Sequence, residues 1–243
     1  MTSSDEERFA AALTHIHEHL NWDALGEQYC DDGGAEFFPP TQREAITEAG
    51  LRIAGELGDA LKGRGSGRSL YVGAALAELI PMLCECLVFG REVIAVNLEN
   101  AETEALNEAL AAAARSVSAD LFQIQTEPWD GRDLRPCDHV WLVSVLTDPG
   151  AFPALHDELY HRSGTPLATQ RGHLPDELAR ARQLVRNMLE AAAPDARLTT
   201  TDEEAPILLE QCERRKWSLE IPEHGRLSAI VGDVIRFCQI RPL

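Results

Sequence analysis

The sequence predicts an α/β fold: a doubly wound, mostly parallel seven-stranded sheet with an N-terminal helical segment and a C-terminal antiparallel hairpin. Three observations predict it. Apolar residues recur at helical spacing through the first sixty residues. Short buried β runs then alternate with helical segments as far as residue 216. Finally, the apolar period changes to two over residues 216–240, which is typical of a hairpin.

The N-terminal segment is expected to hold helices over residues 3–25 and 41–63, separated by a loop rich in Gly, Pro and Asp. Thr41 and Glu44 form a T-x-x-E capping pattern, which predicts the start of the second helix. We therefore expect a helical cap over residues 1–62 and a second, larger domain over residues 68–243.

The larger domain alternates regularly up to its fourth strand. Strands are expected over residues 69–74, 92–99, 120–129, 137–148 and 196–202. Helices are expected over residues 74–90, 100–116, 151–164, 176–195 and 203–216. Asn100 precedes acidic residues at the start of its helix and is the expected N-cap.

Composition limits the classes of partner. The formal net charge of −18, without a basic stripe, disfavours nucleic acid and favours a small-molecule substrate. No run reaches the ~18 apolar residues that a membrane span needs, and the acidic N-terminus does not resemble a secretory signal. Six cysteines without C-x-x-C spacing are typical of free thiols, so we expect a cytoplasmic protein.

Two clusters of small residues flank the first expected strand. Gly63, Gly65 and Gly67 precede it and are interpreted as a flexible connector from helix to strand. The second cluster, residues 73–77, follows the strand. Because open parallel sheets bind ligands at the carboxyl ends of their strands, a ligand is expected at the second cluster.

The stretch LYVGAALAE, residues 70–78, resembles the first motif of Rossmann-like S-adenosylmethionine-dependent methyltransferases, in which a hydrophobic strand ends in G-x-G-x-G. Gly73 matches the first glycine, and Ala75 and Ala77 keep the next two positions small. The resemblance extends through most of residues 68–243, including an antiparallel last strand. It implies S-adenosylmethionine as the cofactor, with Tyr71, Gly73, Ala74 and Ala75 around it.

The same resemblance assigns further positions. Asn97, followed by Glu99, stands where the family binds the cofactor ribose. Glu127 stands where the family places a residue near the adenine, and Trp129 would stack on a ring. The end of the strand over residues 137–148 would face the methyl acceptor.

Three departures from the family pattern leave two functions open. Tyr71 replaces an acid, Asn97 replaces the ribose-binding acid, and Ala75 carries a β-carbon where backbone approach is close. The protein is therefore either a methyltransferase that acts on a small molecule or a non-catalytic relative that serves as a binding or assembly subunit. No catalytic base is identified.

Two groups of ligating side chains have simpler interpretations. His15 and His19 share a helix face, but without H-E-x-x-H or identified further ligands they are interpreted as a solvated face, and no metal is predicted. Cys84 and Cys86 are expected to be core thiols.

Two loops and one strand end are candidate pocket linings. Residues 160–175 form either a lid that attracts anions, or else a surface loop or homodimer contact. The basic side chains of this loop are His161, Arg162, Arg171 and His173. The loop between the N-terminal helices offers Tyr29, Cys30 and Asp31. Asp148 would either orient an acceptor or cap a helix.

Overall fold

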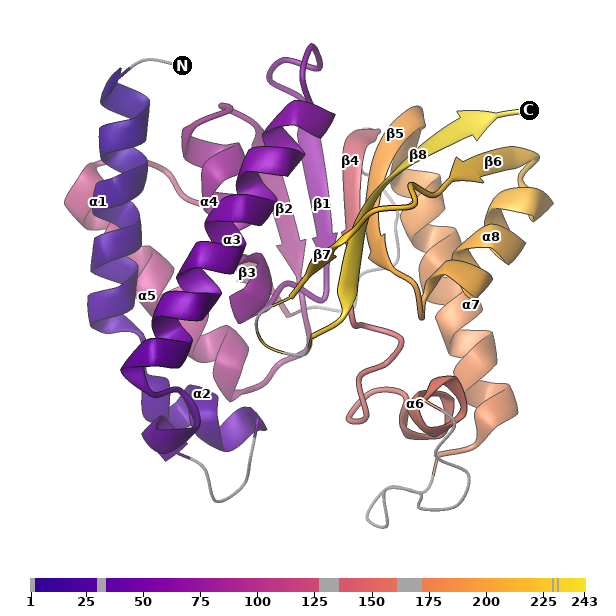
Figure 1. Cartoon of the computed structure of the whole chain (residues 1–243), viewed down its shortest axis with the longest axis horizontal. Helices are drawn as coiled ribbons and strands as arrows, with labels where there is room; N and C mark the ends of the chain where they lie inside the picture. Colours follow the sequence, from indigo (N-terminus) through magenta and orange to yellow (C-terminus); the bar gives the residue numbers. More distant parts are fainter. Residues whose placement is uncertain (1–2, 30–33, 127–135, 161–171, 229, 231) are drawn as a thin grey trace. The chain divides into compact units, whose positions relative to one another are not determined.

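The computed structural model describes residues 3–29, 34–126, 136–160, 172–228, 230 and 232–243. The chain forms two compact units (Figure 1). Unit 1 comprises Met1–Pro128 and Leu227–Gly232, and unit 2 comprises Trp129–Arg226 and Asp233–Leu243. Within the described ranges, no helix is both long and apolar enough to cross a membrane.

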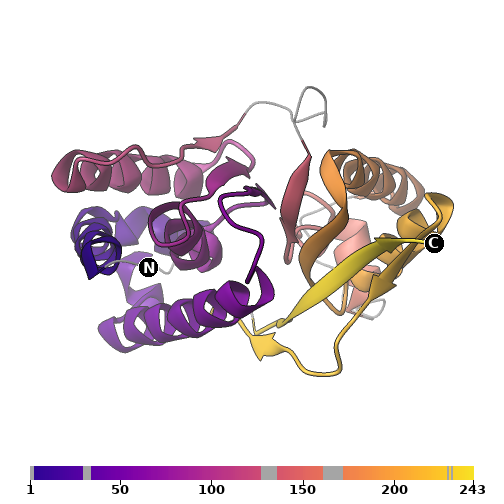
Figure 2. The same cartoon turned by 90° about the horizontal axis from the view of Figure 1, so that it is seen from above.

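Unit 1 contains a parallel sheet with helices packed around it. Its strands are β1 (Arg68–Val72), β2 (Glu92–Val96) and β3 (Ile124–Gln125). Its helices are α1 (Ser3–His19), α2 (Trp22–Tyr29), η1 (Gly34–Phe37), α3 (Pro40–Ala60), η2 (Leu76–Glu78), α4 (Leu79–Leu87) and α5 (Ala101–Val117). Strand β2 pairs in parallel with β1 on one side and with β3 on the other. Figure 2 shows α5 and α3 on opposite sides of α1 and α4.

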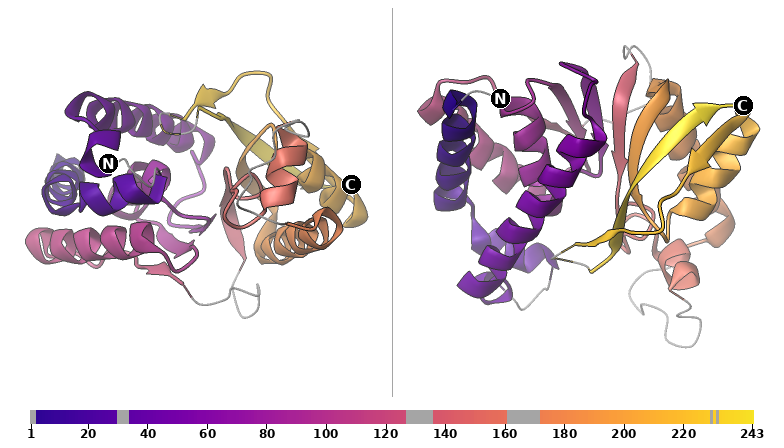
Figure 3. Two further views of the ribbon diagram at one scale, coloured as in Figure 1. Left: turned by 90° about the horizontal axis from the view of Figure 1, so that it is seen from below. Right: turned by 45° about the horizontal axis from the view of Figure 1, so that its top comes forward.

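Unit 2 contains a mixed sheet. Its strands are β4 (Cys137–Leu142), β5 (Ala192–Thr201), β6 (Trp217–Glu220) and β8 (Val234–Pro242), and a short strand β7 spans Arg226–Leu227. Strands β4 and β5 are parallel, whereas β8 is antiparallel to both β5 and β6. The helices are α6 (Pro153–Leu159), α7 (Leu174–Ala191) and α8 (Ala205–Arg214), and α7 and α8 lie on one face of the sheet (Figure 3).

The predicted α/β class is confirmed, with mostly parallel pairing and antiparallel strands at the C-terminus. The described residues form eight strands instead of seven. The third strand is only two residues long, and the hairpin connection adds β7. The division into a cap over residues 1–62 and a domain over residues 68–243 stays a prediction.

The two helix caps that the sequence predicts have different outcomes. Asn100 is confirmed as the N-cap of α5, because its side chain accepts a hydrogen bond from the Thr103 N–H at 2.8 Å. The prediction that Thr41 and Glu44 cap the start of the second helix is wrong. Helix α3 begins one residue earlier, at Pro40, so Thr41 lies inside the first turn. Proline suits that first position because its missing N–H would have no partner in the helix.

A buried hydrogen-bond network joins β1 to α4. Ser69 and Tyr71 are two residues apart on β1 and therefore point to the same face of the sheet. Both hydroxyls donate to the carboxylate of Glu85 on α4, Tyr71 at 2.6 Å. The Arg91 Nε–H donates to the same carboxylate at 2.7 Å, and both charged side chains are at most 1% exposed.

Arg91 also fixes the glycine-rich connector. Its guanidinium donates to the Gly65 carbonyl and to the Arg68 carbonyl, each at 3.2 Å. Gly63 and Gly65 have φ of 85° and 60°, a left-handed conformation that glycine adopts without strain. The first glycine cluster therefore lies, as predicted, between α3 and β1, and a buried cation holds it there.

We expect Arg91→Met to lower the free energy of unfolding by about 3–5 kcal/mol, because it leaves the Glu85 carboxylate buried without its cation. Urea unfolding followed by circular dichroism would measure the loss.

The matched control is Arg68→Met, which removes an Arg68–Glu92 pair whose side chains are 17% and 48% exposed. This change should lower the stability by no more than about 1 kcal/mol. Equal losses in the two variants would contradict the role given to the buried pair.

Candidate cofactor site

The loop after β1 begins at Gly73, whose φ of 77° turns the chain sharply at the carboxyl end of the strand. The N–H groups of Gly73 and Ala74 both donate to the Val96 carbonyl, at 2.9 and 3.0 Å. These bonds carry the β1–β2 pairing one step beyond the strands. The loop therefore starts at the edge where parallel sheets bind their ligands.

Asn97, the first residue after β2, connects the two strand ends. Its side-chain amide donates to the Ala74 carbonyl at 2.9 Å, and its Oδ1 accepts from the Leu98 N–H at 2.8 Å. The Asn97 N–H donates to the Gln125 carbonyl of β3. Asn97 is half-buried, whereas Glu99 is exposed. The structure thus brings together Gly73, Ala74 and Asn97, which the sequence assigned separately.

Two buried carboxylates cap the next amides of this loop. The Ala75 N–H donates to Glu78 at 3.1 Å, and the Leu76 N–H donates to Glu102 at 2.9 Å. Glu78 and Glu102 are 3% and 5% exposed. The N-terminus of a helix attracts anions through its unpaired N–H groups. Here the protein's own carboxylates bind the amides of Ala75 and Leu76.

Tyr29 connects the end of α2 to the same loop. Its hydroxyl donates to Glu102 at 2.9 Å, so one carboxylate oxygen accepts from both Tyr29 and Leu76. Tyr29 is predicted from the sequence as a pocket lining, whereas Glu102 is not. The only signal was its position as an acid in the first turn of α5, and that position equally suits a solvated residue.

Tyr71 is fully buried, and its hydroxyl binds Glu85. Burial raises the pKa of Tyr71 well above its usual value, and the nearby Glu85 carboxylate raises it further, so the hydroxyl stays a proton donor. Among the other positions that the sequence proposed, Glu127 and Trp129 lie outside the described residues, as do Cys30 and Asp31.

A hollow of about 440 Å³ lies among the N-terminal helices of unit 1. Its lining residues are His17, Trp22, Arg43, Glu44, Thr47 and Glu48. The Arg43 guanidinium lies over the Trp22 ring, 4.4 Å from its centroid. Burial lowers the pKa of His17, and the positive charge of Arg43 lowers it further. No sequence motif indicated this hollow.

In unit 2, the chain after β4 also turns through a left-handed residue. Ser144 has φ of 57°, which is uncommon for a residue with a β-carbon. Its hydroxyl donates to Asp233 at 2.6 Å, and the Tyr160 hydroxyl donates to the same carboxylate at 3.1 Å. This serine–tyrosine–aspartate cluster follows the strand that was expected to face the methyl acceptor. No sequence signal indicates Asp233, which lies 89 residues from Ser144 in the chain.

His156 lies beside this cluster, with its ring centroid 4.8 Å from that of Tyr160. Its Nδ1 is 2.6 Å from the Thr147 carbonyl and must therefore carry the proton of that hydrogen bond. Its Nε2 is buried and has no partner among the described atoms. With the hydrogen on Nδ1, the Nε2 of the neutral ring is a hydrogen-bond acceptor.

Glu204 supports the turn after β4. Its carboxylate accepts from the N–H groups of Val145 and Leu146, at 2.7 and 2.9 Å, and from the Thr200 hydroxyl at 3.2 Å. Burial raises its pKa from 4.5 to about 7, although these hydrogen bonds lower it.

The remaining sequence-based assignments concern Asp148, the basic side chains of the loop over residues 160–175, and two cysteines. Asp148 does not cap α6, whose N-cap is Phe152; instead its carboxylate accepts from the Gly150 N–H at 2.7 Å in a tight turn. The Nδ1 of His173 lies 2.9 Å from a carboxylate oxygen of Asp176. The other three basic residues of that loop, His161, Arg162 and Arg171, lie outside the described residues. Cys84 and Cys86 are half-buried rather than fully in the core.

Neither a protein-family model nor a curated relative matches the sequence. Solved structures do match it. Magnesium protoporphyrin IX methyltransferase (ChlM) from Synechocystis PCC 6803, solved with bound S-adenosylmethionine, is 11% identical over 84% of this chain and 85% of its own, with a TM-score of 0.50. A methyltransferase from Pyrococcus furiosus is 10% identical over 78% of this chain and 83% of its own, with a TM-score of 0.44.

The chain therefore has the Rossmann-like fold of S-adenosylmethionine-dependent methyltransferases, as its resemblance to their first motif predicted. At 11% identity the likeness shows the fold alone, so the activity has to be argued from the residues.

The pKa of Glu204 predicts a pH dependence. Between about pH 4.5 and pH 7 the folded chain holds a proton that the unfolded chain releases. The stability that this proton contributes is fully present below pH 4.5 and is lost as the pH rises through 7. Between pH 4.5 and pH 8, we expect the free energy of unfolding to fall by about 3 kcal/mol more in wild type than in Glu204→Gln. Urea unfolding at both pH values would measure this difference.

Glu213→Gln, an exposed substitution at the end of the neighbouring α8, is the control. It should follow wild type at both pH values. Parallel pH profiles for wild type and Glu204→Gln would contradict the assignment.

Proposed function

We propose that this protein binds S-adenosylmethionine at the carboxyl ends of β1 and β2 and transfers its methyl group to a small molecule. The observation that carries the proposal is the bond between the Asn97 side chain and the Ala74 carbonyl. It sets the loop after Gly73 against the end of β2, at the edge where this class of fold takes its ligand. The likeness in fold to a methyltransferase solved with the bound cofactor supports the same class.

The proposed mechanism is one of positioning. The loop would hold the cofactor so that its sulfonium methyl lies in line with a nucleophile of the acceptor. A small acceptor is supported by the net charge of −18, which disfavours binding to a phosphate backbone.

A second function, that of a non-catalytic binding or assembly subunit, is favoured by the capped loop. Glu78 and Glu102 already bind the amides of Ala75 and Leu76. If the carboxylate of the cofactor used these amides, it would have to displace buried glutamates. In the second function these bonds are permanent and the site holds no cofactor.

We expect wild-type protein to bind S-adenosylhomocysteine in isothermal titration calorimetry, and Gly73→Ala to weaken binding at least about tenfold, since a β-carbon would stand where the ligand approaches the backbone. Gly65→Ala is the matched control, because Gly65 also has positive φ (60°, against 77° for Gly73) and a β-carbon there would meet no atom within 4 Å. Equal binding by both variants would contradict the placement of the site.

Glu102→Ala separates the two functions because it frees the Leu76 amide. Under the methyltransferase proposal wild type binds the ligand. If wild type does not bind at millimolar ligand but Glu102→Ala does, the glutamate closes the site and the non-catalytic function is supported. If neither binds while both remain folded by circular dichroism, the cofactor proposal is wrong.

A further inference from the structure

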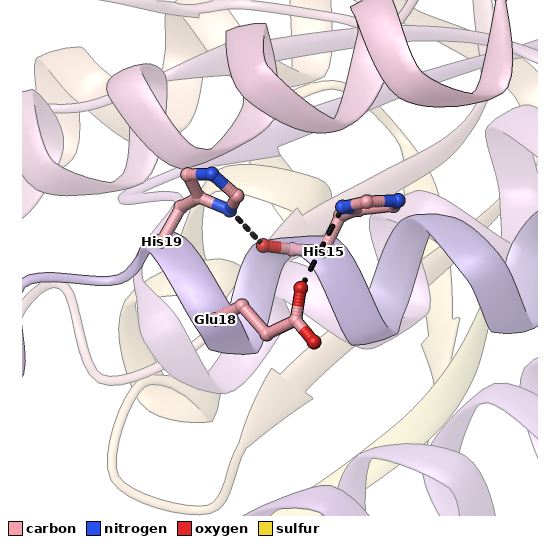
Figure 4. A group of neighbouring side chains, drawn as sticks. All are labelled: His15, Glu18 and His19. Carbon is pink, nitrogen blue, oxygen red and sulfur yellow. Dashed lines mark hydrogen bonds and ion pairs between the residues drawn. The ribbon is translucent and has the colours of Figure 1, made fainter.

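Three side chains that can ligate a metal lie together on the outward face of α1. His15, Glu18 and His19 each offer one ligand atom, and these atoms all lie within 4.8 Å of one another (Figure 4). They stand at positions i, i+3 and i+4 of one helix and so share a face. His15 is half-buried, and the other two are exposed. The sequence-based interpretation of this stretch was a solvated face.

The helix that carries this group is held firmly from its other side. Ala12 and Ile16 are fully buried, and Leu20, just after the helix, is 5% exposed. Helix α1 packs against α5 and α4 within unit 1. The backbone of the three residues is therefore already ordered before any ion binds, so only their side chains would have to be ordered on binding.

A backbone hydrogen bond defines which nitrogen of His19 carries hydrogen. Its Nδ1 lies 2.8 Å from the His15 carbonyl oxygen, which only accepts hydrogen bonds. Nδ1 must therefore carry the hydrogen in this arrangement, and the lone pair of the neutral ring lies on Nε2, so the His19 ring would have to turn to bring Nε2 toward His15 and Glu18 when an ion binds.

His15 and Glu18 already face each other. The His15 Nδ1 lies 3.7 Å from a carboxylate oxygen of Glu18, which is longer than a hydrogen bond. His17, in contrast, lines the hollow beside Trp22, with a ring-centroid distance of 6.3 Å between the two. The stretch HIHEH is thus divided between two environments, and only the first, fourth and fifth of its residues form the group.

We propose that His15, Glu18 and His19 bind a divalent transition-metal ion, with Zn²⁺ as the best match. Two imidazoles with one carboxylate form a ligand set that zinc accepts, whereas Mg²⁺ and Ca²⁺ prefer oxygen ligands alone. The acidic chain, with a net charge of −18, also favours cations at its surface. Three protein ligands leave one tetrahedral position open to water.

The test is isothermal titration calorimetry of the full chain with ZnCl₂, alongside His15→Gln, His19→Gln, Glu18→Gln and His224→Gln. We expect one Zn²⁺ per chain in wild type. Loss of either group histidine should weaken binding at least about tenfold, since even outer-shell partners of metal sites commonly contribute that much. Glu18→Gln should weaken it less. His224→Gln, an exposed histidine outside the group, should bind as wild type does.

The absorption spectrum of added Co²⁺ provides a second readout, because it distinguishes nitrogen and oxygen ligands from the cysteine thiolates of the chain. We expect ligand-field bands without thiolate charge transfer, and their loss in His15→Gln/His19→Gln. Undiminished Zn²⁺ binding in this double variant, a thiolate spectrum, or no binding by wild type would overturn the proposal.

Discussion

The carboxylate of Glu85 accepts hydrogen bonds from Ser69, Tyr71 and Arg91 inside unit 1, and the rest of that unit depends on it. A buried carboxylate is unfavourable unless a cation and hydrogen-bond donors satisfy it. Once satisfied, it ties β1 to α4, and through Arg91 it also fixes the carbonyl of Gly65. The strand that leads into the cofactor loop is therefore anchored at both ends, by this network before it and by the Val96 carbonyl after it.

The same network explains why Tyr71 departs from the methyltransferase pattern. An acid at that position would face the Glu85 carboxylate, and two neighbouring buried carboxylates repel each other. A tyrosine hydroxyl donates a hydrogen bond instead. The tyrosine that replaces the acid therefore helps to satisfy the buried Glu85 carboxylate. In the loop beyond it, Glu78 and Glu102 accept hydrogen bonds from the amides of Ala75 and Leu76. The second departure, Asn97, has a similar origin, since an aspartate could not donate to the Ala74 carbonyl.

Much of the fold was predictable because it depends on local pattern. The alternation of buried β runs with helical segments identified the α/β class, and Asn100 followed by acids identified the start of α5. The errors were also local. Thr41 fits a capping pattern, but Pro40 begins the helix first. The third strand was predicted at ten residues and pairs over only two, because pairing depends on its neighbour and not on its own β propensity.

The sequence by itself determined the order of strands and helices, since this order follows from periodicity. From glycine placement it also predicts a ligand site after β1. Only the tertiary structure decided what each polar side chain does. Glu102 meets Tyr29 across 73 residues, and Ser144 meets Asp233 across 89. A carboxylate on a helix reads the same in sequence whether it is solvated, caps a distant amide or awaits a metal. The tertiary fold determines which partners lie near it, because a hydrogen bond needs its two atoms within about 3 Å of each other.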